Sequence, residues 1–322
     1  MQSAQGSLEG HQSIYSLKLA ADIGWTLCGT KKAGVWLSKL AQIMELKRGP
    51  SVSYPRVIVC RGDVIESNDV CGINISTCWH VKRKNVFDLW THDDTPDLIF
   101  DIKEETDDSL DFLRMSFLVS LLFIDICLSG GLPFHAALLE NRGRGILLAA
   151  SGGKGKTTSS RRLPPHWRVL CDDETLVIKD GQGNFRVHPF PTWSEYIWRK
   201  SAPTWNVESH LPLAAIFFLD QAEKDKVISL GRARAAAYMN RSAKETVSAI
   251  KAGYSIAERQ HIQKKIFESA IDIGKAVPAY LLRSSPTGRF WEKIEEVLEW
   301  GSHSKEKERE FKGVIYEGRS GT

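Results

Sequence analysis

Residues 149–162, with the sequence AASGGKGKTTSSRR, combine residue types that bind phosphate. Glycine can adopt the positive φ that lets successive backbone N–H groups point toward one anion. A helix that begins directly after the glycines would add the partial positive charge of its N-terminus. Lys156 would then reach the β- and γ-phosphates of ATP, and the Thr157 hydroxyl would bind Mg²⁺. The predicted nucleotide-binding residues are Ser151, Gly152, Gly153, Lys154, Gly155, Lys156, Thr157 and Thr158.

The loop matches the pattern G-x-x-x-x-G-K-[ST] except at the first position, which is Ala150. A Gly- and Ser-rich surface loop is the alternative interpretation. An apolar run, residues 145–148, precedes the loop, and a helix start follows it. This is the context that a phosphate loop requires, and it favours phosphate binding.

Two adjacent aspartates, Asp172 and Asp173, end a strand-like segment that follows the loop and its helix. Adjacent carboxylates repel each other in a dry site unless one binds a metal and the other a substrate hydroxyl. Mg²⁺ and a transferring phosphoryl group would give the pair a use. The alternative is a polar junction between a strand and a turn.

His135 lies in the apolar segment LPFHAALLE, one hairpin before the loop strand. A single histidine in an apolar strand is more often a hydrogen-bonded core residue. The turn NRGRG would nevertheless bring this strand beside the loop strand, and with it His135 beside the phosphates. Both interpretations stay open from the residues alone.

Aromatic and cationic side chains gather in residues 186–205, where they could hold a peptide or pack on the sheet as a proline-rich crossover. They are Phe190, Trp193, Tyr196, Trp198, Arg199, Lys200 and Trp205. Cations also gather in residues 232–241, and they could meet phosphates or lie on a solvated helix face. They are Arg232, Arg234 and Arg241. We expect His188, beside Pro189, to be structural.

Short apolar runs separated by turn residues occupy residues 15–100 and predict a mainly antiparallel sheet with one helix over residues 35–46. A buried helix should follow, capped by Asp108 or Ser109 and ended by Gly130-Gly131. Its uninterrupted apolar part, residues 115–124, is too short to span a bilayer, so we expect no membrane insertion.

After residue 131 the pattern predicts alternating strands and helices. Strands are expected in LPFHAALLE, ILLAA, WRVLCDDETLVIKD, FRVHPF, LAAIFFLD and VPAYLLR. Residues 235–275 and the segment GRFWEKIEEVLEW have helical patterns. The continuous apolar run LAAIFFLD is typical of a sheet covered on both faces. The predicted fold class is therefore α/β, and α+β for the chain as a whole.

The composition is that of a globular protein, with 42% hydrophobic residues, 25% charged residues and a formal net charge of +4. This charge is too small to indicate nucleic-acid binding. The six cysteines show no C-x-x-C pair and no tight metal-ligand spacing, so they indicate neither a zinc site nor a disulfide framework. We expect a reducing, cytoplasmic location, since the N-terminal residues also lack the pattern of a signal peptide.

The segment FHAALLENRGRGILLAASGGKGKTT, followed by RVLCDDETLVI, resembles the core of the HPr kinase/phosphatase family. There a His-containing strand, a hairpin, a P-loop and an Asp-Asp strand follow one another. The segments HPFPTWSEYIWRK, TWNVESHLPLAAIFFLDQA and VPAYLLRSSPTGRFWEKIEEVL resemble the SynChlorMet cassette protein C family more closely. Its members are HPr-kinase-like proteins encoded in cassettes for ribosomally made, modified peptides. The core resemblance covers residues 131–180, and the looser one extends to about residue 300.

The resemblance implies a nucleotide-binding core like that of phosphoenolpyruvate carboxykinase, with ATP and Mg²⁺ as cofactors. The implied catalytic residues are His135, Lys156, Asp172 and Asp173, and the implied metal ligands are Thr157, Asp172 and Glu174. Asp173 matches the aspartate that accepts the hydroxyl proton, and His135 matches the histidine beside the phosphates. Glu195 is a second candidate for the family's downstream glutamate ligand.

We therefore expect an ATP- and Mg²⁺-dependent kinase that phosphorylates a Ser/Thr hydroxyl, on a ribosomally made peptide. Two alternatives stay open: a kinase for a small hydroxylated molecule such as a free amino acid, and a non-catalytic, nucleotide-gated module that binds a peptide. HPr-kinase relatives often assemble as oligomers, so the resemblance also allows a homo-oligomer. The expected parts of the chain are a disordered tail (1–12), an N-terminal α+β region (13–108), a P-loop kinase domain (109–300) and a charged tail (301–322).

Overall fold

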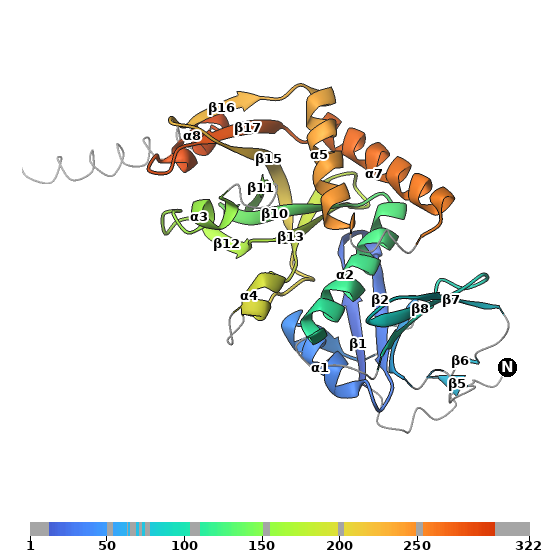
Figure 1. The fold of residues 1–322 in the computed structure, drawn as a ribbon. Helices are drawn as coiled ribbons and strands as arrows, with labels where there is room; N and C mark the ends of the chain where they lie inside the picture. The colour runs from blue at the N-terminus through green and yellow to red at the C-terminus, as the bar shows by residue number, and fades with distance from the viewer. Residues whose placement is uncertain are drawn as a thin grey trace, which may run out of the picture.

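The computed structural model describes residues 13–49, 54–62, 64, 69–70, 73–74, 78–103, 110–150, 155–198, 203–248 and 254–299. Two mixed sheets lie one above the other, with helices on their faces (Figure 1). The predicted α+β class is confirmed. Both predicted tails lie outside the described residues.

The first sheet has the strand order β3-β1-β2-β4-β9-β8-β7. Its strands are β1 (Ser13–Lys18), β2 (Gly24–Gly29), β3 (Lys47–Arg48), β4 (Arg56–Arg61), β7 (Trp79–Arg83), β8 (Phe87–His92) and β9 (Leu98–Ile102). A separate short ladder joins β5 (Asp69–Val70) and β6 (Ile73–Asn74). The central strands β2, β4 and β9 are parallel. The antiparallel prediction is wrong at this centre, because the connection through α1 (Gly34–Ile43) allows β2 and β4 to run in the same direction.

The second sheet has the order β11-β10-β13-β14-β15-β17-β16, with additional pairings of β12 to β10 and β11 to β15. Its strands are β10 (Leu132–Asn141), β11 (Arg144–Ala149), β12 (Arg168–Cys171), β13 (Glu174–Lys179), β14 (Phe185–Pro189), β15 (Leu211–Gln221), β16 (Lys226–Ser229) and β17 (Ala279–Ser284). Strands β11, β15 and β17 are parallel. Their carboxyl ends therefore lie at one edge of the sheet.

Local backbone chemistry explains the hairpin that begins this sheet. Strands β10 and β11 are joined at Arg142 and Gly143, which both have positive φ (54° and 72°). Positive φ at both central residues is the geometry of a tight turn whose twist suits a hairpin. The predicted turn is confirmed, and it sets β11 beside β10.

The expected strand WRVLCDDETLVIKD is divided in two. Strand β12 pairs with residues 138–140 of β10, and β13 pairs with residues 132–135. Asp172 and Asp173 lie in the bend between them, where the Ala136 N–H donates to the Asp173 carbonyl at 2.9 Å. The break thus holds both aspartates beside the middle of β10.

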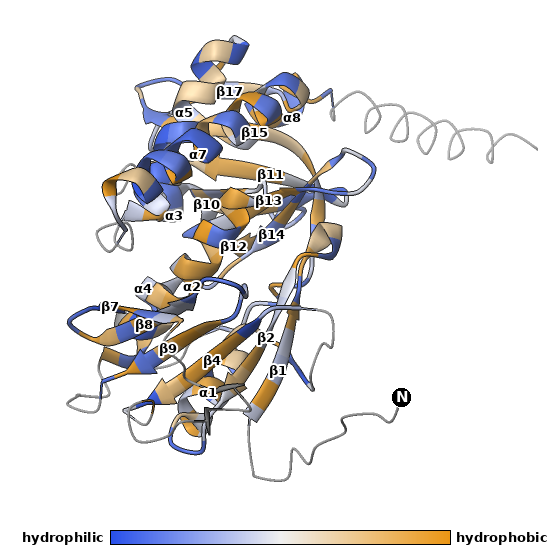
Figure 2. Ribbon diagram, turned by 90° about the vertical axis from the view of Figure 1, so that its right-hand side faces the viewer, coloured by the Kyte–Doolittle hydropathy of each residue, from blue (hydrophilic) through white to orange (hydrophobic). Residues whose placement is uncertain are grey.

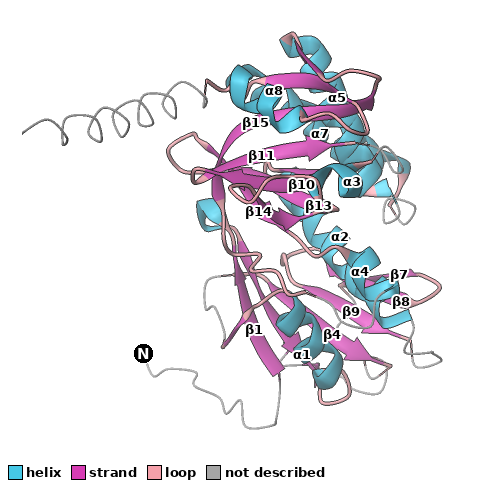
Figure 3. Ribbon diagram, turned by 90° about the vertical axis from the view of Figure 1, so that its left-hand side faces the viewer, coloured by secondary structure: helices cyan, strands magenta, loops and turns pink. Residues whose placement is uncertain are grey.

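The remaining helices cover these sheets. They are η1 (Ala20–Asp22), α2 (Asp111–Leu128), α3 (Lys156–Ser160), α4 (Trp193–Trp198), α5 (Arg232–Thr246), α7 (Ile256–Ala276) and α8 (Phe290–Val297). Figure 3 shows α5 and α7 together on one side of the second sheet. Within the described ranges, none of the helices is long and apolar enough to cross a membrane.

Helix α2 is the predicted buried helix, and it connects the two sheets. Its Phe117 ring packs on Phe87 of β8, and the Trp25 indole of β2 donates to Asp125 Oδ2 at 3.2 Å. The helix also lies against β10. It ends before Gly130, where φ is +92°, as predicted, whereas the expected caps Asp108 and Ser109 lie outside the described residues.

Apolar residues from both sheets and from α2 share one buried cluster, beside two smaller clusters. Figure 2 shows the hydrophobic residues in orange along the strands of both sheets. His188 of β14 has a structural role, as predicted, because it links η1 beside the first sheet to the segment before β15 in the second sheet. The fully buried ring donates from Nδ1 to the Val207 carbonyl (2.8 Å) and accepts the Ala20 N–H at Nε2 (3.2 Å). Burial lowers the pKa of His188 to about 4.

The aromatic segment packs inside the protein. Phe190, Trp193 and Trp205 are buried, and Tyr196 packs between Phe112 and Trp205. These aromatics therefore pack against the fold, and the peptide-holding interpretation is wrong for them. The Trp198 side chain, Arg199 and Lys200 lie outside what the structure describes.

Candidate active site

The predicted phosphate loop connects the end of β11 to the start of α3, the strand-loop-helix context that the motif requires. Ser151, Gly152, Gly153 and Lys154 lie outside the described residues. Gly155 precedes the helix with φ +89°. Among the described residues, a Cβ there would meet the Gln221 side chain alone, at 3.9 Å. The positive φ is therefore what requires glycine at this position.

Lys156 turns back over the start of the loop. Its side chain is buried and its Nζ donates to the Ala150 carbonyl at 2.9 Å. Burial lowers the pKa of Lys156, while Asp173, Asp172 and Glu245 act in the opposite direction. Three carboxylates therefore lie close enough to the ammonium group to offset part of its desolvation.

Asp172 is held by groups from two segments, α3 and the residues before α4. Ser160 Oγ donates to its Oδ1 at 3.3 Å, and its own N–H donates to Thr192 Oγ1 at 3.2 Å. Burial raises the pKa of Asp172, and a hydrogen bond from the Thr157 hydroxyl is the largest opposing effect. The structure thus brings together Thr157 and Asp172, two oxygen donors of the kind that Mg²⁺ prefers.

Asp173 lies beside His135, with 3.2 Å between Oδ1 and Nδ1 and about a quarter of each side chain exposed. Burial lowers the pKa of His135, and Lys156 lowers it further against the opposing effect of Asp173. The ring is therefore neutral near pH 7, and its Nδ1 lies beside the Asp173 carboxylate. The backbone N–H of His135 donates to Ser242 Oγ, and its ring contacts the predicted base.

Glu174 is the third predicted metal ligand. Its Oε2 is buried and has no hydrogen-bond partner among the described residues. Burial raises the pKa of Glu174 to about 8, and the nearby charge of Asp173 acts in the same direction. The Trp193 indole has a smaller, opposite effect. Its Nε1 has no hydrogen-bond partner among the described residues. A carboxyl protonated near pH 7 must lose its proton before it can bind Mg²⁺, so the metal role of Glu174 stays a prediction. The second candidate, Glu195, lies on α4.

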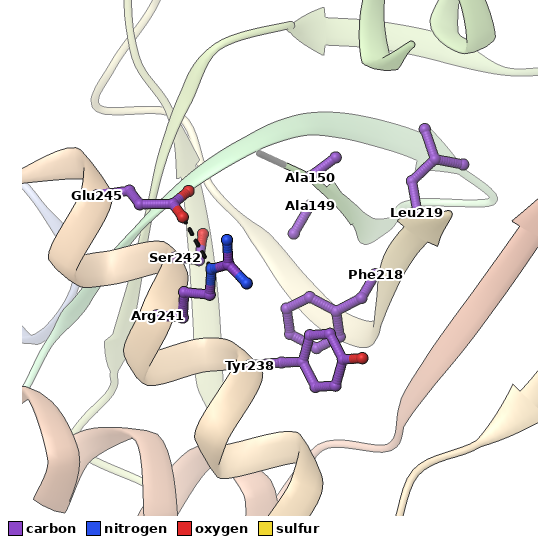
Figure 4. A pocket seen from close by; sticks show the side chains of 8 residues that line it. All are labelled: Ala149, Ala150, Phe218, Leu219, Tyr238, Arg241, Ser242 and Glu245. Atoms are coloured by element: carbon purple, nitrogen blue, oxygen red, sulfur yellow. Dashed lines mark hydrogen bonds and ion pairs between the residues drawn. The ribbon is translucent and has the colours of Figure 1, made fainter. Parts of the chain in front are cut away.

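Helix α5 contributes side chains that sequence reasoning did not place at the site. A small pocket lies between this helix and the ends of β11 and β15 (Figure 4). It is lined by Ala149, Ala150, Phe218, Leu219, Tyr238, Arg241, Ser242 and Glu245. The four helical residues have i, i+3, i+4, i+7 spacing, which places them on one face of the helix. That spacing is the signal that could have found them.

Ser242 and Glu245 tie α5 to the site. Ser242 Oγ accepts the His135 N–H at 3.1 Å. Arg241 Nε donates to Glu245 Oε1 at 3.0 Å, and Glu245 acts on the pKa values of both His135 and Lys156. Of the three arginines considered for phosphate, all of which are exposed, Arg241 lines the pocket, whereas Arg232 and Arg234 lie near the start of the helix.

A larger cavity of about 500 Å³ lies on the other side of α3, at the carboxyl ends of β15 and β17. Its lining residues are Gly155, Thr158, Ser159, Arg162, Leu219, Asp220, Gln221, Ala222, Glu223, Ser284, Ser285 and Pro286. Arg162 closes one side by donating to the Ser285 carbonyl at 2.9 Å. Ligands of open α/β sheets commonly bind at this edge.

The model of the family SynChlorMet cassette protein ScmC matches residues 98–299, more than half of the chain. The chain belongs to this family. The matched region runs from β9 to α8, so the ScmC family region includes His135, Lys156, both aspartates and Glu245. No curated protein sequence matches the chain significantly.

Proposed function

We propose that this ScmC family protein is an ATP- and Mg²⁺-dependent kinase that phosphorylates a serine or threonine hydroxyl. The observation that carries the proposal is the convergence of a buried loop lysine, Lys156, with Asp172 and the His135–Asp173 pair. Burying charged side chains costs free energy unless they pair with one another. A loop with a purely structural role would not need a lysine and two aspartates buried together at one edge of the sheet. The resemblance to HPr kinases supports the same reaction class.

In the proposed reaction, Asp173 accepts the proton of the substrate hydroxyl as its oxygen attacks the γ-phosphorus of ATP. The bond from that phosphorus to the bridging oxygen breaks, and ADP leaves. We assign His135 as a positioning residue, because its Nδ1 lies 3.2 Å from one Asp173 oxygen and leaves the other oxygen for the hydroxyl. Lys156 would exchange the Ala150 carbonyl for a phosphate oxygen.

Mg²⁺ would supply positive charge for the phosphate oxygens. Thr157 and Asp172 fit as its ligands, since both are oxygen donors and Thr157 lies near enough to Asp172 to lower its pKa. Glu245 is the carboxylate on α5 that acts on Lys156 and His135, and we assign it as a further acidic group of the site. The cavity of about 500 Å³ beside α3 could hold the nucleoside of ATP.

A peptide substrate remains our first choice, because the resemblance is to proteins encoded in peptide cassettes. A second candidate is a kinase for a small hydroxylated molecule. It is favoured because Phe190, Trp193 and Trp205 are buried and so cannot contact a bound peptide. A nucleotide-gated binding module is the third. The cytoplasmic location, the lack of nucleic-acid partners and a homo-oligomer stay predictions.

The test is intact-mass spectrometry of candidate hydroxyl substrates, peptide and small-molecule, after incubation with the full chain, ATP and Mg²⁺. We expect a gain of one phosphate, with Lys156→Ala and Asp173→Asn each reducing the rate by about 10²-fold or more. The matched controls are Lys179→Ala and Asp272→Asn, which remove an exposed ion pair (2.8 Å) on the surface. Activity of both site variants within a few-fold of wild type would exclude the assignment. Tight ATP binding without any phosphorylated product would instead support the binding module.

A further inference from the structure

Cys78, His92 and Asp94 meet at the open end of the β7–β8 hairpin in the first sheet. The pairing of Trp79 with His92 brings the residues before β7 beside those after β8. The Cys78 sulfur, a His92 ring nitrogen and an Asp94 carboxylate oxygen all lie within 4.8 Å of one another. Sequence spacing did not reveal this group, because its members come from opposite strands.

These three groups are a ligand set for zinc. Thiolate, imidazole and carboxylate bind Zn²⁺ at about 2.0–2.3 Å, which places the ligand atoms of a tetrahedral site about 3.3–3.7 Å apart. Side-chain movement of about 1 Å would bring the present separations into that range. Three protein ligands would leave the fourth position to water.

Two contacts hold the His92 ring beside the other two groups. Its ring packs edge-on against Trp79, with 5.1 Å between the ring centroids. The Asp94 N–H donates to His92 Nδ1 at 3.0 Å, so that lone pair is occupied in this structure. A metal that binds at Nδ1 would have to replace this hydrogen bond.

We propose that Cys78, His92 and Asp94 bind a zinc-type divalent metal that clips the open end of the β7–β8 hairpin. Strand β7 is the edge strand of its sheet, and edge strands require protection against wrong pairing. A metal bound to ligands before β7 and after β8 would hold this edge in register. Because only the folded hairpin brings the ligands together, metal binding would stabilise it.

The same hairpin offers a matched control. His80 follows Trp79, so its side chain lies on the opposite face of the strand, where its Nε2 lies 2.9 Å from Asp93 Oδ2. His80→Asn and Asp93→Asn therefore change a histidine and an aspartate next to the proposed ligands without removing a ligand.

The experiment is a titration of the reduced, full-length protein with Co²⁺, followed by competition with Zn²⁺. We expect one Co²⁺ per chain with a thiolate-to-cobalt charge-transfer band, and a zinc-dependent rise in the midpoint of thermal unfolding. Among the described cysteines Cys78 is the exposed one, and the others, Cys28, Cys60, Cys127 and Cys171, are buried. Cys78→Ser should therefore abolish the band, and Asp94→Asn should weaken binding by about 10-fold or more.

Absence of a stoichiometric band in the wild type would overturn the proposal. Retention of the band in Cys78→Ser would also overturn it, as would equal weakening by the His80 and Asp93 controls. None of these measurements uses phosphoryl transfer, so the result does not depend on the proposed kinase activity.

Discussion

Acidification should destabilise the protein through His188. This fully buried ring can serve its two contacts only when neutral, since Nδ1 donates to Val207 and Nε2 accepts the Ala20 N–H. A proton on Nε2 would face the Ala20 N–H and leave that donor without an acceptor. Burial, with His210 as a smaller like-charged influence, lowers the pKa of His188 from 6.5 to about 4.

The sign and size of the effect follow from these values. Because the pKa is lower in the folded state, the unfolded chain binds more protons between pH 4 and pH 6.5. The stabilisation is complete above about pH 6.5 and is lost as the pH falls toward 4. The lowered pKa of His188 contributes about 3 kcal/mol to the free energy of unfolding at high pH. About 2 kcal/mol of this contribution is lost between pH 7.5 and pH 5.0.

The assay is urea unfolding of wild type and His188→Gln at both pH values. The free energy of unfolding of the wild type should fall by about 2 kcal/mol more than that of the variant. His261→Gln, at an exposed position on α7, serves as the control and should behave like wild type. Should the variant fail to fold, an NMR titration of the His188 ring replaces it. Equal pH dependence in both proteins, or a ring midpoint near 6.5, would refute the reasoning.

Three further substitutions test other parts of the fold and site. Gly155→Ala forces an L-residue to φ +89° and should cost about 1–2 kcal/mol locally, weakening ATP binding in calorimetry; unchanged affinity would contradict a loop role. Ser255→Ala removes half of the capping box with Glu258 at the start of α7 and should lower the free energy of unfolding by about 1 kcal/mol in urea. Arg114→Met leaves the Asp111 carboxylate without its buried partner, which lies 3.0 Å away in the wild type. The free energy of unfolding, measured by thermal unfolding, should fall by about 3 kcal/mol or more. A fall below about 1 kcal/mol would show that solvent replaces the ion pair.

Local sequence determined the parts of the site that depend on neighbouring residues. The order of β11, a loop and α3 follows from an apolar run, a glycine that takes φ +89° and a short polar helix. The hairpin before it follows from Arg142 and Gly143. His135 could be expected near the loop for the same reason, since one tight turn fixes which residues of two strands face each other.

Sequence could not predict the surroundings that set the chemistry of each group. Glu174 differs from Asp172 in its burial against Trp193, which raises its pKa to about 8, and no local pattern encodes that burial. Glu245 reaches the site only because α5 packs across β10. Likewise, the aromatics near Trp193 could equally have faced solvent until α2 covered them.

By itself, then, the sequence determined most helices and strands, because hydrophobic period and turn chemistry act over a few residues. Helix α4 was not among them. Tertiary structure alone decided the parallel centre of the first sheet, the division of the Asp-Asp strand and the meeting of Cys78 with His92. Each of these depends on which strands pair, and strand pairing is set by long-range burial that minimises the free energy of the whole chain.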